Sequence, residues 1–179
     1  MKQTLPKIES AGLRTRALTF EKKYFFELFS QESIRKEFNP KYYGMKRWNF
    51  ELKNLGERNA GSCDPQKRRI LIDQRHRNDD TALLHEMIHA YEETISRDRH
   101  DVYLQYLTLK LYSKLVRKIP RLRSIIDHHY SYFGDHSPFF FLKSLDLDFR
   151  FRKPLGTVLG YGTSKGIRSI QKRKIQIVP

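Results

Sequence analysis

The sequence predicts an α+β fold in which a small antiparallel sheet packs on helices. Residues 80–95 and 102–119 place apolar side chains at helical spacing. Residues 48–52 and 69–73 show the short alternating or continuous apolar pattern of strands. The chain of 179 residues, with 39% hydrophobic and 13% aromatic residues, is long enough and apolar enough for one folded domain.

The N-terminal part of the chain predicts a basic lead-in, a helix and a strand. Residues 1–19 are mixed in character and basic, and a helix is expected over 20–38, which the Asn-Pro pair at 39–40 ends. The segment 48–52 alternates apolar and polar residues, as a half-buried strand does. Asn-Leu-Gly at 54–56 predicts a turn after it.

The middle of the chain predicts a second strand followed by a well-capped helix. A stretch of small residues at 59–62 precedes the strand Arg-Ile-Leu-Ile-Asp at 69–73. Polar and acidic residues at 78–81 then offer side chains that cap backbone N–H groups and favour the positive end of the helix dipole. The helix expected at 80–95 therefore has a defined start.

The C-terminal third predicts a further long helix and an apolar segment. The helix at 102–119 carries one apolar stripe, which favours core packing over a partner site, and Pro120 ends it. The stripe consists of Leu104, Leu107, Leu111 and Leu115. A short helix is expected at 125–132, and residues 139–145 are apolar after a turn. The predicted organisation is a lead-in to residue 19, a domain over 20–162 and a basic tail over 163–179.

The segment His85-Glu86-Met87-Ile88-His89 is the strongest chemical signal in the chain. Positions i and i+4 of a helix share a face, so the two imidazoles can reach one metal ion, while Glu86 is placed to hold a water. This arrangement is typical of zinc hydrolases that activate water against a peptide bond. The alternative is a packed or solvated pair of histidines, but a buried His-Glu-His cluster without a metal would have a desolvation cost.

The net charge of +15, from 35 basic and 20 acidic residues, favours a polyanionic partner. Nucleic acid fits best, although an anionic membrane surface or no such partner would also agree with the charge. The tail over 163–179 has five cations and no acid, and is interpreted either as a phosphate-binding arm or as a solvated end. These cations are Lys165, Arg168, Lys172, Arg173 and Lys174.

Composition also excludes several classes of protein. No apolar run approaches the roughly 18 residues that a membrane span requires, and the first residues lack the apolar core of a secretory signal. The single cysteine, Cys63, excludes an internal disulfide and a multi-cysteine zinc ribbon. It is interpreted as a small packed residue rather than a nucleophile. An intracellular protein of the cytoplasm, nucleoid or nucleus is expected.

A catalytic zinc usually takes three protein ligands, so a third is needed beside His85 and His89. An acid on the same straight helix presents a third ligand poorly, and a later segment is the better source. Sequence spacing does not choose among the later histidines. The full set of candidates is His76, His100, His128, His129, His136, Glu92 and Glu93.

Three segments together resemble the Spartan-related, SprT-like zinc metalloprotease family. Residues 84–91, Leu-His-Glu-Met-Ile-His-Ala-Tyr, are similar to its active-site helix. Residues 58–63 and the strand after them are similar to its R-x-A-G-x-C segment and following strand. Residues 136–140, His-Ser-Pro-Phe-Phe, resemble its H-G-P-x-F segment, which carries the third histidine. The resemblance covers roughly residues 58–140. Three matching segments in the right order are far more specific than the His-Glu-x-x-His box at 85–89 alone.

This resemblance implies a zincin-like metalloprotease domain that binds Zn²⁺ through His85, His89 and His136. It implies Glu86 as the general base and proteins bound or crosslinked to DNA as substrates, hence a role in DNA repair. It also suggests that the strand at 69–73 pairs with an extended substrate by strand addition. The oligomeric state stays open.

The sequence departs from the family pattern in three ways. His136 follows His89 by 47 positions, a long separation, so that the helix at 102–119 is interpreted as an insertion and His100 is the rival third ligand. Ser137 stands where the family has glycine. The cysteine-rich zinc ribbon of many family members is absent, so any binding to DNA must come from the basic surface and tail.

Three alternative functions remain at this point. The chain could be a nucleic-acid-binding protein with a structural zinc, a zinc hydrolase acting on a small amide, or a binding domain with an inactive box.

Overall fold

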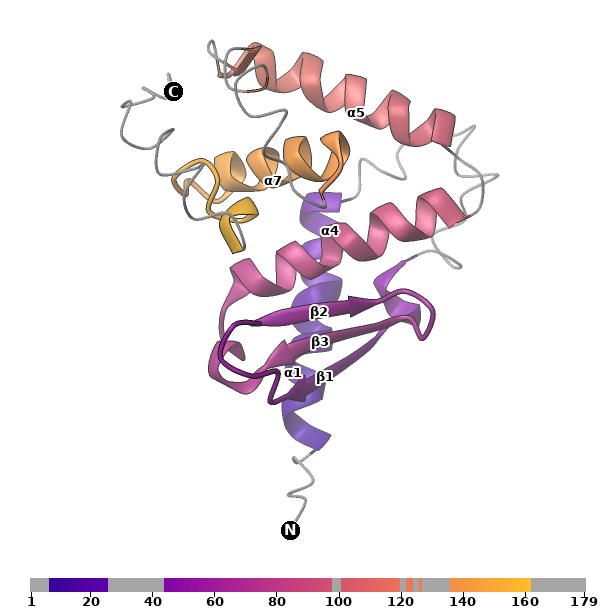
Figure 1. Ribbon diagram of the computed structural model, residues 1–179, viewed down its shortest axis with the longest axis vertical. Coiled ribbons are helices and arrows are strands. Elements are labelled where there is room, and N and C mark those ends of the chain that lie inside the picture. The colour runs from indigo at the N-terminus through magenta and orange to yellow at the C-terminus, as the bar shows by residue number, and fades with distance from the viewer. Residues whose placement is uncertain are drawn as a thin grey trace. The chain divides into compact units, whose positions relative to one another are not determined.

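The computed structural model describes residues 7–25, 44–97, 101–119, 122–123, 126 and 136–161. The chain divides into two compact units, Met1–Thr94 and Ile95–Pro179. The predicted α+β class is confirmed, because the described residues form four α-helices and a three-stranded sheet (Figure 1).

The sheet contains β1 (Asn49–Lys53), β2 (Gly61–Asp64) and β3 (Arg69–Asp73), with β3 in the centre (Figure 1). β2 pairs with β3 in antiparallel fashion, whereas β1 pairs with β3 in parallel. The expectation of an antiparallel sheet is therefore wrong for β1. The reason is topological: β2 and β3 run in opposite directions, so β3 runs in the same direction as β1, and because β3 inserts between β1 and β2 it becomes the hydrogen-bonded neighbour of β1.

Both faces of the central strand are covered. Ile70, Leu71 and Ile72 are all buried, although successive side chains of a strand point to opposite faces. Phe50 of β1 lies opposite Ile70 and is buried with it. This two-sided burial explains why residues 70–72 are all apolar while β1 alternates.

Most of the expected basic lead-in, from Lys7 onward, forms helix α1 (Lys7–Phe20), which the sequence did not predict. Leu13 and Ala17 lie one helical turn apart and are both buried, so this face of α1 belongs to the core. A π-helical turn, Glu21–Phe25, continues it. The remainder of the helix expected at 20–38 lies outside the described residues.

Helix α4 (Asp80–Arg97) begins where the acidic residues before it predict. The Asp79 carboxylate accepts a hydrogen bond of 2.8 Å from the Thr81 N–H, as an N-cap does. The Arg16 guanidinium of α1 donates to the Asp80 carboxylate at 2.8 Å. The start of α4 is thus fixed both locally and by α1.

A second set of contacts fixes the middle of α4. The Glu21 carboxylate accepts a hydrogen bond from the Tyr91 hydroxyl, and another of 2.7 Å from the Met45 N–H. The Phe25 ring stacks on Tyr91 with centroids 4.8 Å apart. Because Tyr91 is two residues from His89 and fully buried, these contacts set the rotation of α4 about its axis.

The second unit contains α5 (Asp101–Val116) and α7 (Pro138–Arg150), which pack on each other. Leu107, Leu111 and Leu115 of the predicted stripe are buried, which confirms their role in the core. The segment at 139–145, noted only as apolar from its sequence, is helical. Pro120, the helix expected at 125–132 (apart from helical Ile126) and the basic tail lie outside the described residues.

A buried charge cluster joins α5 to α7. The Asp146 carboxylate contacts Lys114 at 2.9 Å, Arg150 at 3.0 Å and Lys143 at 3.3 Å. Burial acts to raise the pKa of Asp146, but the three cations outweigh it and hold that pKa below its ordinary value. The ionised carboxylate therefore fixes the position of α7, the helix that follows His136.

Candidate metal centre

The two histidines of the box lie on one face of α4, as their spacing predicts. The ring centroids of His85 and His89 are 5.0 Å apart, with the planes at 71° to each other. His85 is buried and His89 is half-buried. One helical turn thus places both imidazoles where they can share a ligand.

His136 lies immediately before α7. Ser137 caps that helix, because its hydroxyl accepts a hydrogen bond of 3.1 Å from the Phe140 N–H. The His136 ring packs on Phe140 with centroids 4.2 Å apart. Ser137 therefore has a local role as the N-cap of α7.

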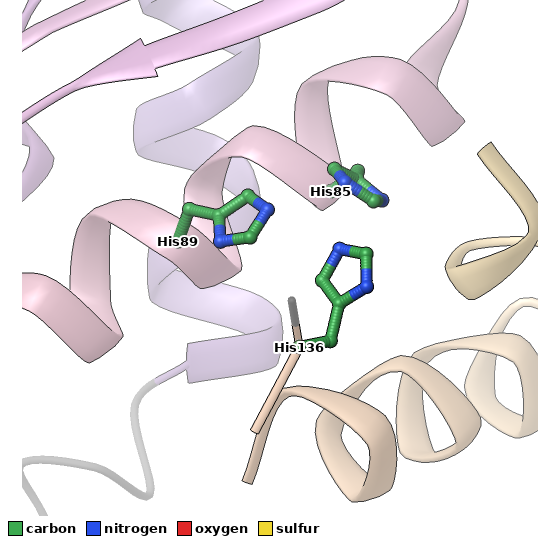
Figure 2. Close-up of side chains that lie close together, drawn as sticks. All are labelled: His85, His89 and His136. Atoms are coloured by element: carbon green, nitrogen blue, oxygen red, sulfur yellow. The ribbon is translucent and has the colours of Figure 1, made fainter. Parts of the chain in front are cut away.

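The structure brings the three predicted ligands together. One ligand atom from each of His85, His89 and His136 lies within 4.8 Å of the other two (Figure 2). Figure 2 shows the rings of His85 and His89 projecting from α4 and that of His136 from the segment before α7. This arrangement is compatible with a metal site.

The donor set of three imidazoles is compatible with a divalent metal ion such as zinc. Zinc binds histidine nitrogen at about 2.0–2.1 Å in tetrahedral geometry, so its nitrogen ligands lie about 3.3 Å apart. The limit of 4.8 Å between ligand atoms exceeds this separation by at most about 1.5 Å. A tetrahedral zinc with three protein ligands would have its fourth position open to water.

Glu86 lies between the two histidines in sequence and is buried, with 5% of its surface exposed. Burial raises the pKa of Glu86 to about 8. A nearby divalent cation would act in the opposite direction, because it favours the ionised carboxylate. Whether Glu86 is protonated at neutral pH therefore depends on whether a metal cation is bound nearby.

Gly61 of β2 provides the space for the Glu86 side chain. A Cβ added at Gly61 would lie 2.6 Å from both Cγ and Oε1 of Glu86. The glycine is therefore required for close approach of the strand to the helix, not for an unusual backbone angle. In the sequence, Gly61 is notable only through the family resemblance, although an isolated glycine in a short strand is a general signal of such an approach.

We predict that Gly61→Ala reduces catalysis without unfolding the protein. The added Cβ would clash with Cγ, Cδ and Oε1 of Glu86, so the Glu86 side chain would have to move together with its carboxylate, and a displacement of about 1 Å lowers rates roughly 10- to 100-fold. The measurement is peptide cleavage together with zinc content and thermal unfolding. Gly12→Ala is the matched control, because a Cβ there meets nothing within 4 Å and alanine in a helix stabilises by about 0.5–1 kcal/mol. Equal cleavage by both variants would contradict this role of Gly61.

Cys63, two residues after Gly61, is half-buried on β2. Burial is the main cause that raises the pKa of its thiol, and the negative charges of Glu86, Glu93 and Asp64 raise it further. The thiol is therefore protonated at neutral pH, which agrees with a packed residue and not with a nucleophile.

Of the remaining candidate ligands, the structure describes His76, Glu92 and Glu93. His76 lies in a 3-10 turn, where its Nδ1 is 3.6 Å from the Asp79 carboxylate. Glu92 and Glu93 lie on α4, and neither belongs to the group of ligand atoms that gather among the described residues. His100, His128, His129 and the five tail cations lie outside those residues.

The strand predicted to pair with substrate is occupied on both sides. β3 bonds to β1 along one edge and to β2 along the other, so the hypothesis that residues 69–73 add a substrate strand is wrong. A continuous apolar strand is typical of the centre of a sheet, where neighbours use both edges. β2, which contacts Glu86 through Gly61, is an outer strand of this sheet.

Comparisons with family models, with curated proteins and with solved structures found no match to this chain. Among the described residues, no helix has the length and apolarity needed to cross a bilayer. The functional assignment therefore depends on the residues and their arrangement.

Proposed function

We propose that this protein is a zinc-dependent endopeptidase with a zincin-like arrangement of its site. The observation that carries the proposal is the gathering of His85, His89 and His136, with Glu86 on the same helix as two of them. Helical His-Glu-x-x-His boxes with a third, distant ligand are the donor sets of metal-dependent peptidases. The resemblance to the SprT-like family supports the same assignment.

In the proposed reaction, Glu86 moves the protons. When bound, zinc supplies a Lewis acid that lowers the pKa of water and polarises a carbonyl. Glu86 accepts the proton of the attacking water and later donates it to the leaving amine, which separates from the peptide carbonyl carbon. Its buried position suits both steps, because burial brings the pKa of a carboxylate closer to neutrality.

The outer strand β2 is the element that we propose to align the substrate. An extended peptide can add to the free edge of a sheet through main-chain hydrogen bonds. β2 passes directly against Glu86, and its first residues, Gly61 and Ser62, are small. A peptide on this edge of β2 would lie close to Glu86. A peptide cannot add to β3, because both edges of β3 are already paired.

The proposed substrates are proteins associated with or crosslinked to DNA. The net charge of +15 favours a polyanion near the site of action, and the family resemblance points to DNA. The tail cations Lys165, Arg168, Lys172, Arg173 and Lys174 remain the predicted phosphate contacts. A DNA-repair role inside the cell is part of this proposal.

The test combines metal analysis with digestion of histone or casein, each with and without DNA. We expect one zinc per chain, cleavage that a chelator abolishes and added zinc restores, and faster cleavage of histone when DNA is present. A zinc-loaded protein that cleaves neither substrate would refute the peptidase assignment.

The same charge favours one second candidate, a nucleic-acid-binding protein with a structural zinc. That protein would bind DNA, cleave nothing, and lose its fold when the zinc is removed.

A further inference from the structure

Arg68 has a backbone conformation that residues other than glycine adopt only at a cost. It lies in the turn between β2 and β3 with φ at +46°, and its N–H donates a hydrogen bond of 3.2 Å to the Pro65 carbonyl. Glycine is the usual residue at such a position of a hairpin, because it has no Cβ. An arginine there does not serve the stability of the turn, so its side chain is a candidate for a role in binding.

Three further cations lie on segments that are bonded to this turn or to each other. The Asn49 N–H at the start of β1 donates a hydrogen bond of 2.8 Å to the Arg68 carbonyl, so Lys46 and Arg47, just before β1, lie at the same end of the sheet as the turn (Figure 1). The Arg14 guanidinium of α1 donates a hydrogen bond of 2.8 Å to the Lys46 carbonyl. Arg14, Lys46 and Arg47 are exposed and Arg68 is half-buried. These four residues, from three segments, are called the turn patch.

Carboxylates do not neutralise the turn patch. In the part of the chain that the structure describes, Arg14, Lys46 and Arg68 form no ion pair with an acid. The hydrogen bond of Arg14 to a neutral carbonyl leaves its charge in place. Lys67 is not included in the turn patch, because its ammonium lies 4.0 Å from the Asp64 carboxylate. The patch therefore offers positive charge to a partner.

The surroundings of the turn patch favour nucleic acid over a membrane. A basic surface that binds a membrane combines its cations with exposed apolar side chains that enter the bilayer interface. The large apolar side chains that are exposed in the described residues all lie on α5, and none lies on a segment of the turn patch. Cations presented from three short segments suit the repeated phosphates of a nucleic-acid backbone.

We propose that the turn patch binds the phosphate backbone of nucleic acid. The inference rests on the proposed association with DNA and adds a contact on the folded part of the chain to those predicted for the tail. The turn patch belongs to the same compact unit as β2 and Glu86. A phosphate bound there would have a fixed place relative to the strand that is proposed to align the substrate.

The test measures binding of a short fluorescent DNA duplex by anisotropy over a series of KCl concentrations, with the full-length, zinc-loaded protein. Arg68→Gly removes the charge and the unfavourable backbone conformation together, Lys46→Gln removes a charge alone, and Arg68→Lys keeps the charge. Lys53→Gln is the control, because it removes one exposed charge at the opposite end of β1. Binding to vesicles that contain phosphatidylserine and thermal unfolding are measured on the same proteins.

We expect the dependence of log K on log [KCl] to become less steep by about 1 in Arg68→Gly and in Lys46→Gln, and by about 2 in the double variant, because each lost phosphate contact releases fewer counterions. Arg68→Lys and Lys53→Gln should keep the wild-type slope. Arg68→Gly should also unfold at a temperature about 2–4 °C higher, since glycine adopts this conformation without strain. A variant that is more stable but binds DNA more weakly would separate a binding role from a structural one.

Equal slopes for Arg68→Gly and Lys53→Gln would overturn the role of the turn patch and leave DNA binding to the tail. If the wild type bound no DNA, the turn patch and the association with DNA would both be wrong, whereas zinc-dependent cleavage of casein would still support the peptidase. Weaker binding of Arg68→Gly to the vesicles with unchanged binding to DNA would assign the patch to a membrane and overturn the proposal.

Discussion

Glu86→Gln should abolish most peptide cleavage while leaving the zinc in place. Glutamine has the shape of glutamate but cannot accept the proton of the attacking water, and loss of a general base lowers kcat roughly 10²- to 10⁴-fold. The fold should survive, because burying a neutral amide is less costly than burying a carboxylate at this buried position. The measurement is kcat on a histone or casein substrate, with zinc content determined on the same preparation.

Glu93→Gln is the control for this experiment. It makes the same change on the same helix at an exposed position, so cleavage should stay at the wild-type level. If Glu86→Gln cleaved as fast as Glu93→Gln, another group would have to be the base and the assignment of Glu86 would fail.

His136→Ala should weaken zinc binding by a large factor. A structural zinc site with four ligands binds with about 10–16 kcal/mol, or roughly 3 kcal/mol for each ligand, which corresponds to about a hundredfold in affinity. The measurement is competition for zinc against a chelator of known affinity. Cleavage should fall with it, since the remaining pair of histidines, His85 and His89, would hold the ion less tightly.

His100→Ala decides between the two candidates for the third ligand. We expect it to bind zinc with the affinity of the wild type, because His136 is the histidine that, among the described residues, has a ligand atom within 4.8 Å of those of the pair on α4. Full zinc affinity in His136→Ala together with a loss in His100→Ala would reverse the assignment.

The elements with strong local signals could be predicted from the sequence. The helix expected at 80–95 is α4 (Asp80–Arg97), and the strand expected at 69–73 is β3 with the same bounds. Both have a periodic or continuous apolar pattern and a defined boundary, and such patterns do not depend on distant residues. The helix expected at 102–119 is α5 (Asp101–Val116), which has the same kind of apolar stripe.

Other elements depend on tertiary contacts and could not be predicted. The apolar face of α1 that enters the core is narrow, with Leu13 and Ala17 among basic residues, and only its contacts show that it is buried. β2 is four residues of small or polar character, so it has little strand propensity of its own and forms because β3 pairs with it. The parallel pairing of β1 follows from the order of strands, which local patterns do not encode.

The candidate site also has a part that the local sequence predicts and a part that depends on tertiary contacts. Helical geometry alone places His85 beside His89, but the choice of His136 required the resemblance to the SprT-like family and has its structural support in the gathering of the three rings. The role of Gly61 could not be predicted from the sequence. The side chain that leaves no room for a Cβ there, that of Glu86, lies on another element.

The contact between Glu21 and Tyr91 determines how far the chain could be shortened. A fragment that started at residue 44 would retain all three sequence segments that suggest a peptidase. It would lose Glu21, Phe25 and Arg16, which anchor the helix bearing the paired imidazoles at two separate points along its length. The smallest functional piece of this protein therefore extends well upstream of its recognisable motifs.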